Sequence, residues 1–447
     1  MKRQAGYRVF FFAGILLMAW AIPAFAADGP DLAASDTGNS GLSELYALIA
    51  YGVEHNPELE RMRADSGVLE ARTTQAGLKS DPKLSIALAN FPAPSFQLDE
   101  TPMTQAVIGW SRSYESHGKR KLKKRLAAFD EKLLLHEIAL TEWELAEEIS
   151  DKYFAISRAR ARLAVLDENI KLVELINRTV EGKYGIGLTP QSEVLRAQLQ
   201  LTRLESARVL EMRKIETAGA MLAGLLGNPA DFDVTRIGHV DSTDTGSAAP
   251  EDADALVGLA MDRRPDFARL RLMLEKKDVA VTLAERASKR DYTLNASYGA
   301  RWGKRDFVSV GIAFPLFTSK SERQDSLVEE KALEGVALSR QLDAMRNTLK
   351  TRVETDLAGL KRLDELIDLY SEGFIPQAEL ALESHIAGFG AEGAQFESLL
   401  KTQELLFDLR TELELMSLDR QELLIDLQLA TAGGFDPANA AREINDD

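Results

Sequence analysis

The sequence predicts a mainly α-helical chain in which one unit, made of a helix, a β-hairpin, a very long helix and a further helix, occurs twice. Three short segments of the first half align with three of the second, which indicates an internal duplication. The offset between the copies is 208 residues at the first strands and 202 at the second, so the first hairpin loop is six residues longer. The aligned pairs are 56–59 with 264–267, 84–88 with 292–296, and 108–111 with 310–313.

The amino terminus has the pattern of a secretory signal peptide. Three basic residues precede an apolar run over 9–22, which ends in the small-residue sequence Ala24-Phe25-Ala26. A transmembrane anchor is the alternative, but the run is too short for one. We expect residues 1–26 to be removed and the mature chain to begin near Ala27. The chain contains no cysteine, so we expect neither a lipid anchor nor disulfide bonds.

The chain is acidic, with a formal net charge of −16 that becomes −19 when the three basic residues of the signal peptide are removed. This charge argues against a nucleic-acid partner. Composition and the repeat predict five segments after the signal peptide. They are a flexible lead over 27–41, a first repeat over 42–240, a linker over 241–252, a second repeat over 253–434 and a C-terminal tail over 435–447.

Each repeat contains a helical stripe too long for a compact core. Between Ser116 and Gly182 there is no proline and one glycine, Gly118, while apolar residues recur at steps of three and four. A continuous helix of this length would extend about 100 Å. The counterpart over 321–387 contains Gly373 and Pro376, where we expect a kink or relay. Pairs of shorter helices stacked end to end would match one long helix; these are expected near 42–77, 190–226, 253–289 and 394–431.

Four candidate strands alternate apolar with small or polar residues, and each has about nine to eleven residues, as a tilted transmembrane strand needs. A soluble sheet with one buried face is the alternative. Four strands cannot close a barrel and lipid tolerates no open edge, so a membrane location requires three chains with twelve strands. The strands are expected at about 82–91, 103–114, 291–301 and 306–317. Aromatic residues at strand ends would form an interface belt: Phe91, Trp110, Tyr114, Trp302, Phe314 and Phe317.

The most specific motif is the hairpin-to-helix junction over 108–120, which ends in Gly-Lys-Arg and follows Asp81-Pro82-Lys83-Leu84 and Ala89-Asn90-Phe91. On this motif the chain resembles the TolC-like outer-membrane efflux factors, and within them the heavy-metal, CzcC-like branch. The resemblance covers nearly everything from residue 42 to 434. The helix-turn-helix tips resemble the family's as well, although the second copy has four extra residues; the tip segments are 184–198 and 387–403.

The resemblance implies a passive trimeric conduit without a cofactor, in which the strands form one 12-stranded outer-membrane β-barrel and the helices form a long periplasmic α-helical barrel. It would lie in the outer membrane of a Gram-negative bacterium and extend into the periplasm. The implied partners are two further copies of the chain, a periplasmic adaptor (membrane fusion protein), an inner-membrane pump of RND type and outer-membrane lipid. An acidic lumen would favour cations, and metal ions are the first expectation for the cargo.

Site residues follow from the same resemblance. Adaptor-facing turns are expected where glycine supplies a positive φ at a helix end. In the family, acidic residues beyond the second-copy turn close the periplasmic entrance, and we expect a gate held by charge pairs at the matching positions. The alternative is ordinary exposed helix charges worth under about 1 kcal/mol each. The turn residues are Gly187, Leu188, Gly388 and Phe389, the gate candidates are Glu193, Arg196, Glu397 and Lys401, and the junction residues are Gly118, Lys119 and Arg120.

Other functional classes fit the sequence less well. An enzyme is not expected, because His136-Glu137-Ile138-Ala139-Leu140 lacks the second histidine of a zinc-protease helix. Five scattered histidines and no cysteine argue against a metal cofactor. A soluble periplasmic coiled-coil adaptor or scaffold would share the helices but would not need four apolar-faced strands. The exit duct of a type I protein secretion system is an alternative within the same family.

Overall fold

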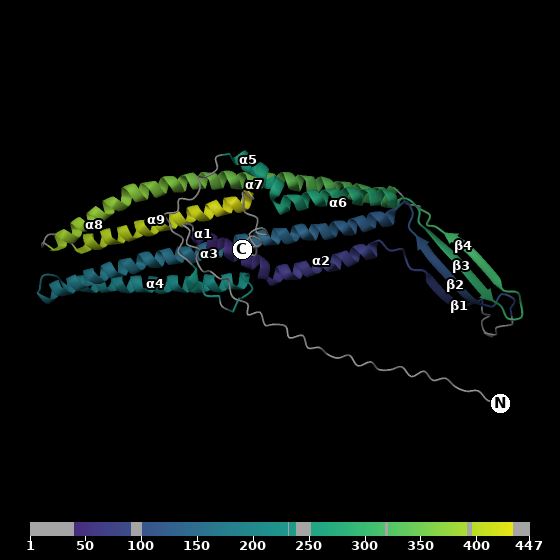
Figure 1. Cartoon of the computed structure of the whole chain (residues 1–447), viewed down its shortest axis with the longest axis horizontal. Coiled ribbons are helices and arrows are strands. Elements are labelled where there is room, and N and C mark those ends of the chain that lie inside the picture. The colour runs from purple at the N-terminus through teal and green to yellow at the C-terminus, as the bar shows by residue number, and fades with distance from the viewer. Residues whose placement is uncertain are drawn as a thin grey trace, which may run out of the picture.

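The computed structural model describes residues 40–90, 101–230, 232–237, 252–317, 321–390 and 396–431. The expected signal peptide, almost all of the lead and the linker, and the C-terminal tail lie outside these residues. The molecule is long and narrow, with a β-sheet at one end and helix ends from both repeats at the other (Figure 1).

The order of the elements confirms the duplication, because each repeat has two short helices, a pair of strands, a long helical stretch and a final helix. The first repeat consists of α1 (Ser40–His55), α2 (Pro57–Ala76), β1 (Lys83–Ala89), β2 (Gln105–Tyr114), α3 (Lys119–Gly185) and α4 (Gln191–Leu225). The second consists of α5 (Ala253–Arg263), α6 (Pro265–Ala287), β3 (Tyr292–Ala300), β4 (Phe307–Ala313), α7 (Ser326–Asp368), α8 (Ile375–Gly390) and α9 (Phe396–Thr431).

The first helical stretch of each repeat is two helices, where the sequence analysis expected one. The break falls before Pro57 in the first repeat and before Pro265 in the second. Proline lacks a backbone donor and forces the preceding residue into an extended conformation, and ψ is 122° at Asn56 and 133° at Arg264. The Asn56 side chain then caps α2 by accepting the Glu58 N–H at 2.9 Å. The prolines therefore start new helices.

The long helices match the expectation. α3 runs unbroken for 67 residues, about 100 Å at 1.5 Å per residue. In the second repeat, the π-helical segment Leu369–Phe374 separates α7 from α8, next to the expected relay at Gly373 and Pro376. A π turn accommodates the donor that Pro376 lacks, so the chain changes its hydrogen bonding here without reversing.

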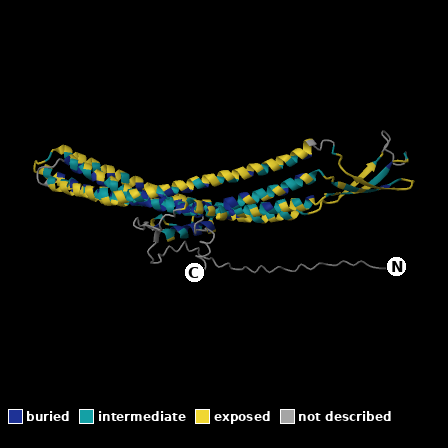
Figure 2. Ribbon diagram, turned by 90° about the horizontal axis from the view of Figure 1, so that it is seen from above, coloured by how far each residue is buried: buried dark blue, intermediate teal, exposed yellow. Residues whose placement is uncertain are grey.

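The helices form one curved layer. Near the sheet the neighbours are α2, α3, α6 and α7 in that order, and toward the far end they are α4, α3, α9 and α8. α2 and α4 thus follow one another along α3, as the half-length helices were expected to do (Figure 1). Buried side chains gather around the middle of the long helices, where α1 packs on α3 (Figure 2). The largest of them include Leu45, Leu48, Ile49, Tyr153 and Phe154.

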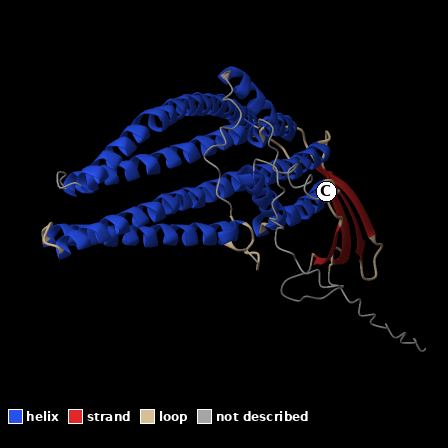
Figure 3. Cartoon of the chain, turned by 60° about the vertical axis from the view of Figure 1, so that its left-hand side comes forward, coloured by secondary structure: helices blue, strands red, loops and turns tan. Residues whose placement is uncertain are grey.

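The strands form one antiparallel sheet in the order β1-β2-β3-β4, which extends beyond the ends of the helices (Figure 3). β2 and β3 have 10 and 9 residues, as expected, whereas β1 and β4 have 7 each. β1 and β4 are the edge strands, so each has a hydrogen-bonded neighbour on one side only. Phe91, expected at the end of β1, lies outside the described residues.

Candidate functional site

The register of the sheet aligns apolar side chains from all four strands on one face. This face is exposed, with Ile86 79% and Val310 82% accessible. Burying apolar surface gains about 25 cal/mol per Å², so a face of this extent is unfavourable in water. One row across it is Leu84, Trp110, Ala296 and Val310, and the next is Ile86, Ile108, Tyr298 and Val308.

The opposite face of the sheet carries mainly small and polar residues, with Val107 and Phe307 as the exceptions. A Cβ on Gly109 would lie 2.5 Å from the Ser85 Oγ, so a larger residue at this position would displace the Ser85 hydroxyl. The predicted alternation is therefore correct in β1 and β3, whereas β2 and β4 each place an apolar residue on this face. The central row of this face is Ser85, Gly109, Ser297 and Ser309.

The hairpin-to-helix junction ties the two repeats together. Gly118 precedes α3 with a φ of +74°, a conformation that favours glycine. Lys119 is 7% exposed, and its Nζ donates to the Lys289 carbonyl at 2.6 Å and to Asp291 Oδ1 at 3.0 Å. The Ser116 N–H donates to the same carboxylate at 2.8 Å. Two of the three predicted junction residues thus have a clear structural role.

Asp291 is the residue of this junction that the sequence analysis missed. It lies 172 residues from Lys119, and no local motif links the two. Burial alone would raise the pKa of Asp291, but the hydrogen bonds from Ser116 and Lys119 outweigh it, and the pKa is lower than usual. Arg120, the third predicted junction residue, is half-buried and has no ion pair with another described residue.

The tip of the first repeat has the predicted turn. Gly187 lies between α3 and α4 with a φ of +78°. Its N–H donates to the Tyr184 carbonyl and the Leu188 N–H donates to the Lys183 carbonyl, both at 2.9 Å, which satisfies carbonyls at the end of α3. Leu188 is 58% exposed. The first tip is thus a hydrogen-bonded turn that presents an apolar side chain.

The second tip differs from the prediction. Gly388 and Phe389 lie within α8, which continues to Gly390, so the helix does not end at Gly388. The four extra residues of this copy explain the difference, because they allow the helix to continue before the chain reverses. Residues 391–395, between α8 and α9, lie outside the described part, as does the side chain of Phe389.

Three of the four gate candidates lie together. Glu397 at the start of α9 contacts Lys401 (Oε1 to Nζ, 2.8 Å) and Arg196 on α4 (Oε2 to Nη1, 3.9 Å). The hydrogen bond from Lys401 and the charges of Lys401 and Arg196 lower the pKa of Glu397. Glu193 instead accepts a hydrogen bond from Thr189. All three clustered side chains are more than half exposed, so these pairs are weak within one chain.

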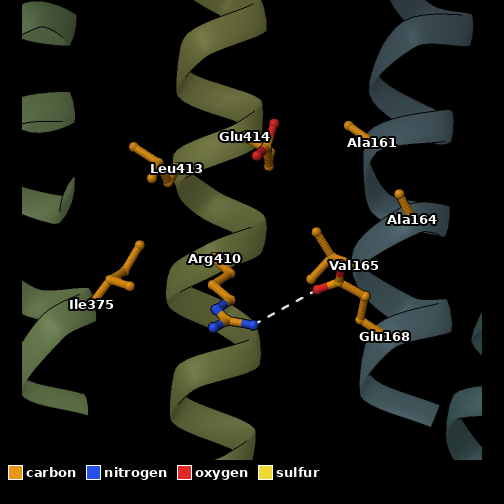
Figure 4. Close-up of a pocket in the computed structure, with 8 residues that line it drawn as sticks. All are labelled: Ala161, Ala164, Val165, Glu168, Ile375, Arg410, Leu413 and Glu414. Carbon is orange, nitrogen blue, oxygen red and sulfur yellow. Dashed lines mark ion pairs between the residues drawn. The ribbon is translucent and has the colours of Figure 1, made fainter. Parts of the chain in front are cut away.

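Farther along the helices, a hollow of about 410 Å³ lies between α3 and α9, with Ile375 of α8 at its border (Figure 4). Arg410 and Glu168 form an ion pair of 3.7 Å across it. Its α3 side is lined by Ala161 and Ala164. Within the described residues, no three His, Cys, Asp or Glu side chains are placed to hold a metal ion. The hollow thus offers small side chains and one ion pair, without a convergent set of groups for chemistry.

No described helix combines the length and the apolar character that crossing a membrane requires.

Comparison with solved structures identifies the architecture. The outer membrane protein VceC of Vibrio cholerae superposes with a TM-score of 0.69 at 19% identity, over 89% of this chain and 99% of that one. The Neisseria gonorrhoeae MtrE outer membrane channel superposes with a TM-score of 0.69 at 16% identity, over 88% of this chain and 90% of that one. The fold is that of an outer-membrane channel. The Campylobacter jejuni CmeC outer membrane channel superposes with a TM-score of 0.69 at 14% identity, over 90% of this chain and 88% of that one.

The outer-membrane channel fold confirms the fold expected from the resemblance to the TolC-like efflux factors. Comparisons with protein-family models and with curated proteins gave no match. Because VceC, MtrE and CmeC superpose equally well at low identity, the heavy-metal branch stays a prediction.

Proposed function

We propose that this protein is the outer-membrane channel of a tripartite efflux system, a passive homotrimeric conduit for small molecules or metal cations. The observation that carries the proposal is the four-stranded sheet, which has one exposed apolar face and two unpaired edges. In water both features favour aggregation. In a membrane the apolar face contacts lipid, and the edges require partners.

The direction of the edge strands suits ring closure. β1 runs away from the helices and β4 runs back toward them, so β4 of one copy lies antiparallel to β1 of the next. The same head-to-tail contact, repeated three times, closes a barrel of twelve strands. It leaves no edge in lipid.

The helices support the same closure. The outer helices on one side are α2 and α4, both from the first repeat, and those on the other side are α7 and α8, both from the second. Each of these helices exposes large apolar side chains that the single chain leaves uncovered. They include Val68 on α2, Leu195, Leu199 and Leu210 on α4, Leu333 and Val336 on α7, and Leu380 on α8. A single kind of contact, between the first-repeat side of one copy and the second-repeat side of the next, can therefore join the copies along both the sheet and the helices.

The helical end supports a periplasmic partner. The first tip exposes Ile186 and Leu188, 72% and 58% accessible, and such side chains suit contact with the helical hairpin of an adaptor. An inner-membrane pump of RND type would supply the energy. The group of Arg196, Glu397 and Lys401 beside the tips is the candidate periplasmic gate. We place the channel in the outer membrane of a Gram-negative bacterium, without a lipid anchor.

The cargo is the least constrained part of the proposal. The assignment of metal cations as the cargo rests on the junction resemblance alone. Growth of a deletion strain on zinc, cobalt, cadmium, copper and silver tests this assignment. Unchanged tolerance to all five would remove metals as the cargo. The exit duct of a type I protein secretion system is the alternative, and the neighbouring genes distinguish it. The exposed apolar face of the sheet argues against a soluble periplasmic adaptor or scaffold.

The first experiment is to cross-link the detergent-extracted protein from an outer-membrane fraction and to measure its electrophoretic mobility with and without heating. A trimer with heat-dependent mobility is the expected result. A soluble periplasmic monomer or dimer would contradict the channel, because the sheet would then face water.

A further inference from the structure

The first two turns of α3 carry a concentrated positive charge. Residues 119–125 read Lys-Arg-Lys-Leu-Lys-Lys-Arg, with six basic residues and no acidic one. The chain as a whole has a net charge of −16, so composition does not explain the cluster. The end of α6 and the residues after it add three more basic residues. We call the set the basic belt: Lys119, Arg120, Lys121, Lys123, Lys124, Arg125, Arg286, Lys289 and Arg290.

The position of the belt is unfavourable for the helix itself. The N-terminus of a helix carries a partial positive charge, which favours acidic side chains in the first turn and disfavours basic ones. α2, α6 and α9 each have an acidic residue in the first turn, but α3 has none. The local structure therefore gives no reason for six positive charges at this helix end.

Contacts with the described part of the protein account for only some of the belt. Lys119 pairs with Asp291, and Lys123 pairs with Glu115 at 2.5 Å. The Arg286 guanidinium donates to a backbone carbonyl. The other members have no ion pair with a described residue, and five of them are exposed: Lys121, Lys124, Arg125, Lys289 and Arg290.

The belt borders the apolar face of the sheet. Tyr114 ends β2 and Tyr292 begins β3, and their rings stack with centroids 5.3 Å apart. Arg290 lies over the ring of Phe314 at 5.7 Å. Amphipathic aromatic rings beside an apolar band mark the boundary between membrane and water. The belt follows directly on the helical side of this boundary. Exposed charges act over about 8–10 Å in physiological salt.

We propose that the basic belt binds the phosphate groups of anionic glycerophospholipids in the leaflet on the helical side of the membrane. The charge is complementary, and the belt is continuous with the face that lies in lipid if the proposed function holds, on which this inference rests. Clusters of four to eight Lys and Arg residues beside a membrane segment bind anionic lipid in this way. The belt would fix the height of the sheet in the bilayer and the angle at which α3 leaves it.

Fluorescence quenching by brominated lipids measures the selectivity for a headgroup. The full trimer is reconstituted in vesicles of phosphatidylcholine with brominated phosphatidylglycerol or brominated phosphatidylcholine as the quencher. Trp110 reports the contact, since it is 38% exposed on the sheet near the helical end of β2, whereas Trp302 lies on the hairpin at the opposite end. We expect the relative association constant to favour phosphatidylglycerol at least about fivefold, the contribution of roughly one basic residue beside an anionic surface.

The test variant combines Lys121→Gln, Lys124→Gln and Arg125→Gln. Its relative association constant for phosphatidylglycerol over phosphatidylcholine should fall to near one. The matched control combines Lys171→Gln, Arg178→Gln and Arg203→Gln, which removes three exposed positive charges far from the sheet and should leave the preference unchanged. If the test variant does not assemble, the wild-type trimer in 1 M salt replaces it, because the screening length then falls to about 3 Å.

The outcomes separate the two proposals. Equal quenching by both lipids in the wild type, or a preference that survives both the belt substitutions and 1 M salt, would overturn lipid binding by the belt. Absence of quenching by either lipid would mean that the sheet is outside the bilayer, and the channel function itself would fail.

Discussion

Lys119 and Asp291 join the two repeats where the helices meet the sheet, with 3.0 Å between Nζ and Oδ1. Lys119 begins α3 of the first repeat, and Asp291 directly precedes β3 of the second. The ammonium is almost completely buried and also bonds the Lys289 carbonyl. A charge this well enclosed depends on its partners, since water cannot replace them.

Lys119→Met should destabilise the folded protein by about 1–3 kcal/mol, because it leaves the Lys289 carbonyl without its donor. The measurement is the temperature at which the trimer dissociates in detergent. Lys121→Met is the matched control, since Lys121 is exposed on the same turn. Equal dissociation temperatures for the two variants would show that the junction bond contributes nothing.

Val310→Lys should prevent insertion, since a lysine on the lipid face near the middle of the membrane costs about 2–4 kcal/mol. Ser309→Lys is the control, because its side chain lies on the small, polar face of the same strand. The readout is the amount of heat-modifiable trimer in the outer-membrane fraction. Equal loss from both variants would contradict the assignment of the two faces.

The two tip glycines should respond differently to alanine. Gly187→Ala places a Cβ at a φ of +78° and should destabilise the first turn by about 1 kcal/mol. Gly388→Ala lies within α8 and should stabilise that helix by up to about 1 kcal/mol. Limited proteolysis of the tips and hydrogen exchange measure the local effect. A destabilised second tip in Gly388→Ala would restore the original prediction of a turn at this glycine.

Asp426 should make stability depend on pH near 6. Burial and the negative charges of Glu422, Asp151 and Glu147 raise its pKa to about 6, although Arg352 opposes them. Because the folded-state pKa is above the ordinary value of 3.8, protonation stabilises the fold below about pH 4, and this stabilisation is lost as the pH rises through 6.

The corresponding variant is Asp426→Asn. At pH 7.5 it should be more stable than the wild type by about 1 kcal/mol, and this advantage should shrink at pH 5. Thermal unfolding at the two pH values provides the comparison. An advantage of the same size at both would show that the carboxyl does not change its protonation in this range.

Glu397→Lys should open the candidate gate, since it removes the contacts with both Arg196 and Lys401. Single-channel conductance in planar bilayers should rise, and drug sensitivity of the host should change. Glu193→Lys should have a smaller effect, because Glu193 bonds Thr189 instead. The control is Glu205→Lys, an exposed charge reversal elsewhere on α4. Unchanged conductance in both Glu193→Lys and Glu397→Lys would rule out the gate.

Much of the fold could be predicted from sequence because it follows from local patterns. Steps of three and four predicted α3, and alternation predicted both faces of β1 and β3. The same rules explain the errors: Pro57 and Pro265 each mark a helix start, but they were used to align the repeats and not to divide the helices. The helix limit at Gly388 was wrong because a glycine permits a turn without requiring one.

The candidate site was less accessible to prediction because it depends on contacts between distant residues. Arg196 and Glu397 come from different repeats, and their pairing requires α4 and α9 to lie together. The Asp291 carboxylate has a role only because the sheet brings β3 beside β2. Neither relationship leaves a pattern within one segment of the chain.

The two long helical stretches differ in stiffness. α3 keeps one hydrogen-bonding pattern over 67 residues and behaves as a rigid strut. Its counterpart contains a joint at Leu369–Phe374, where the wider turn bends more easily. A force applied at the tips would therefore bend the second-repeat stretch more easily than α3. In a ring of three copies, each second-repeat stretch would bend in the same sense. The three pairs of tips would then rotate together about the axis of the ring.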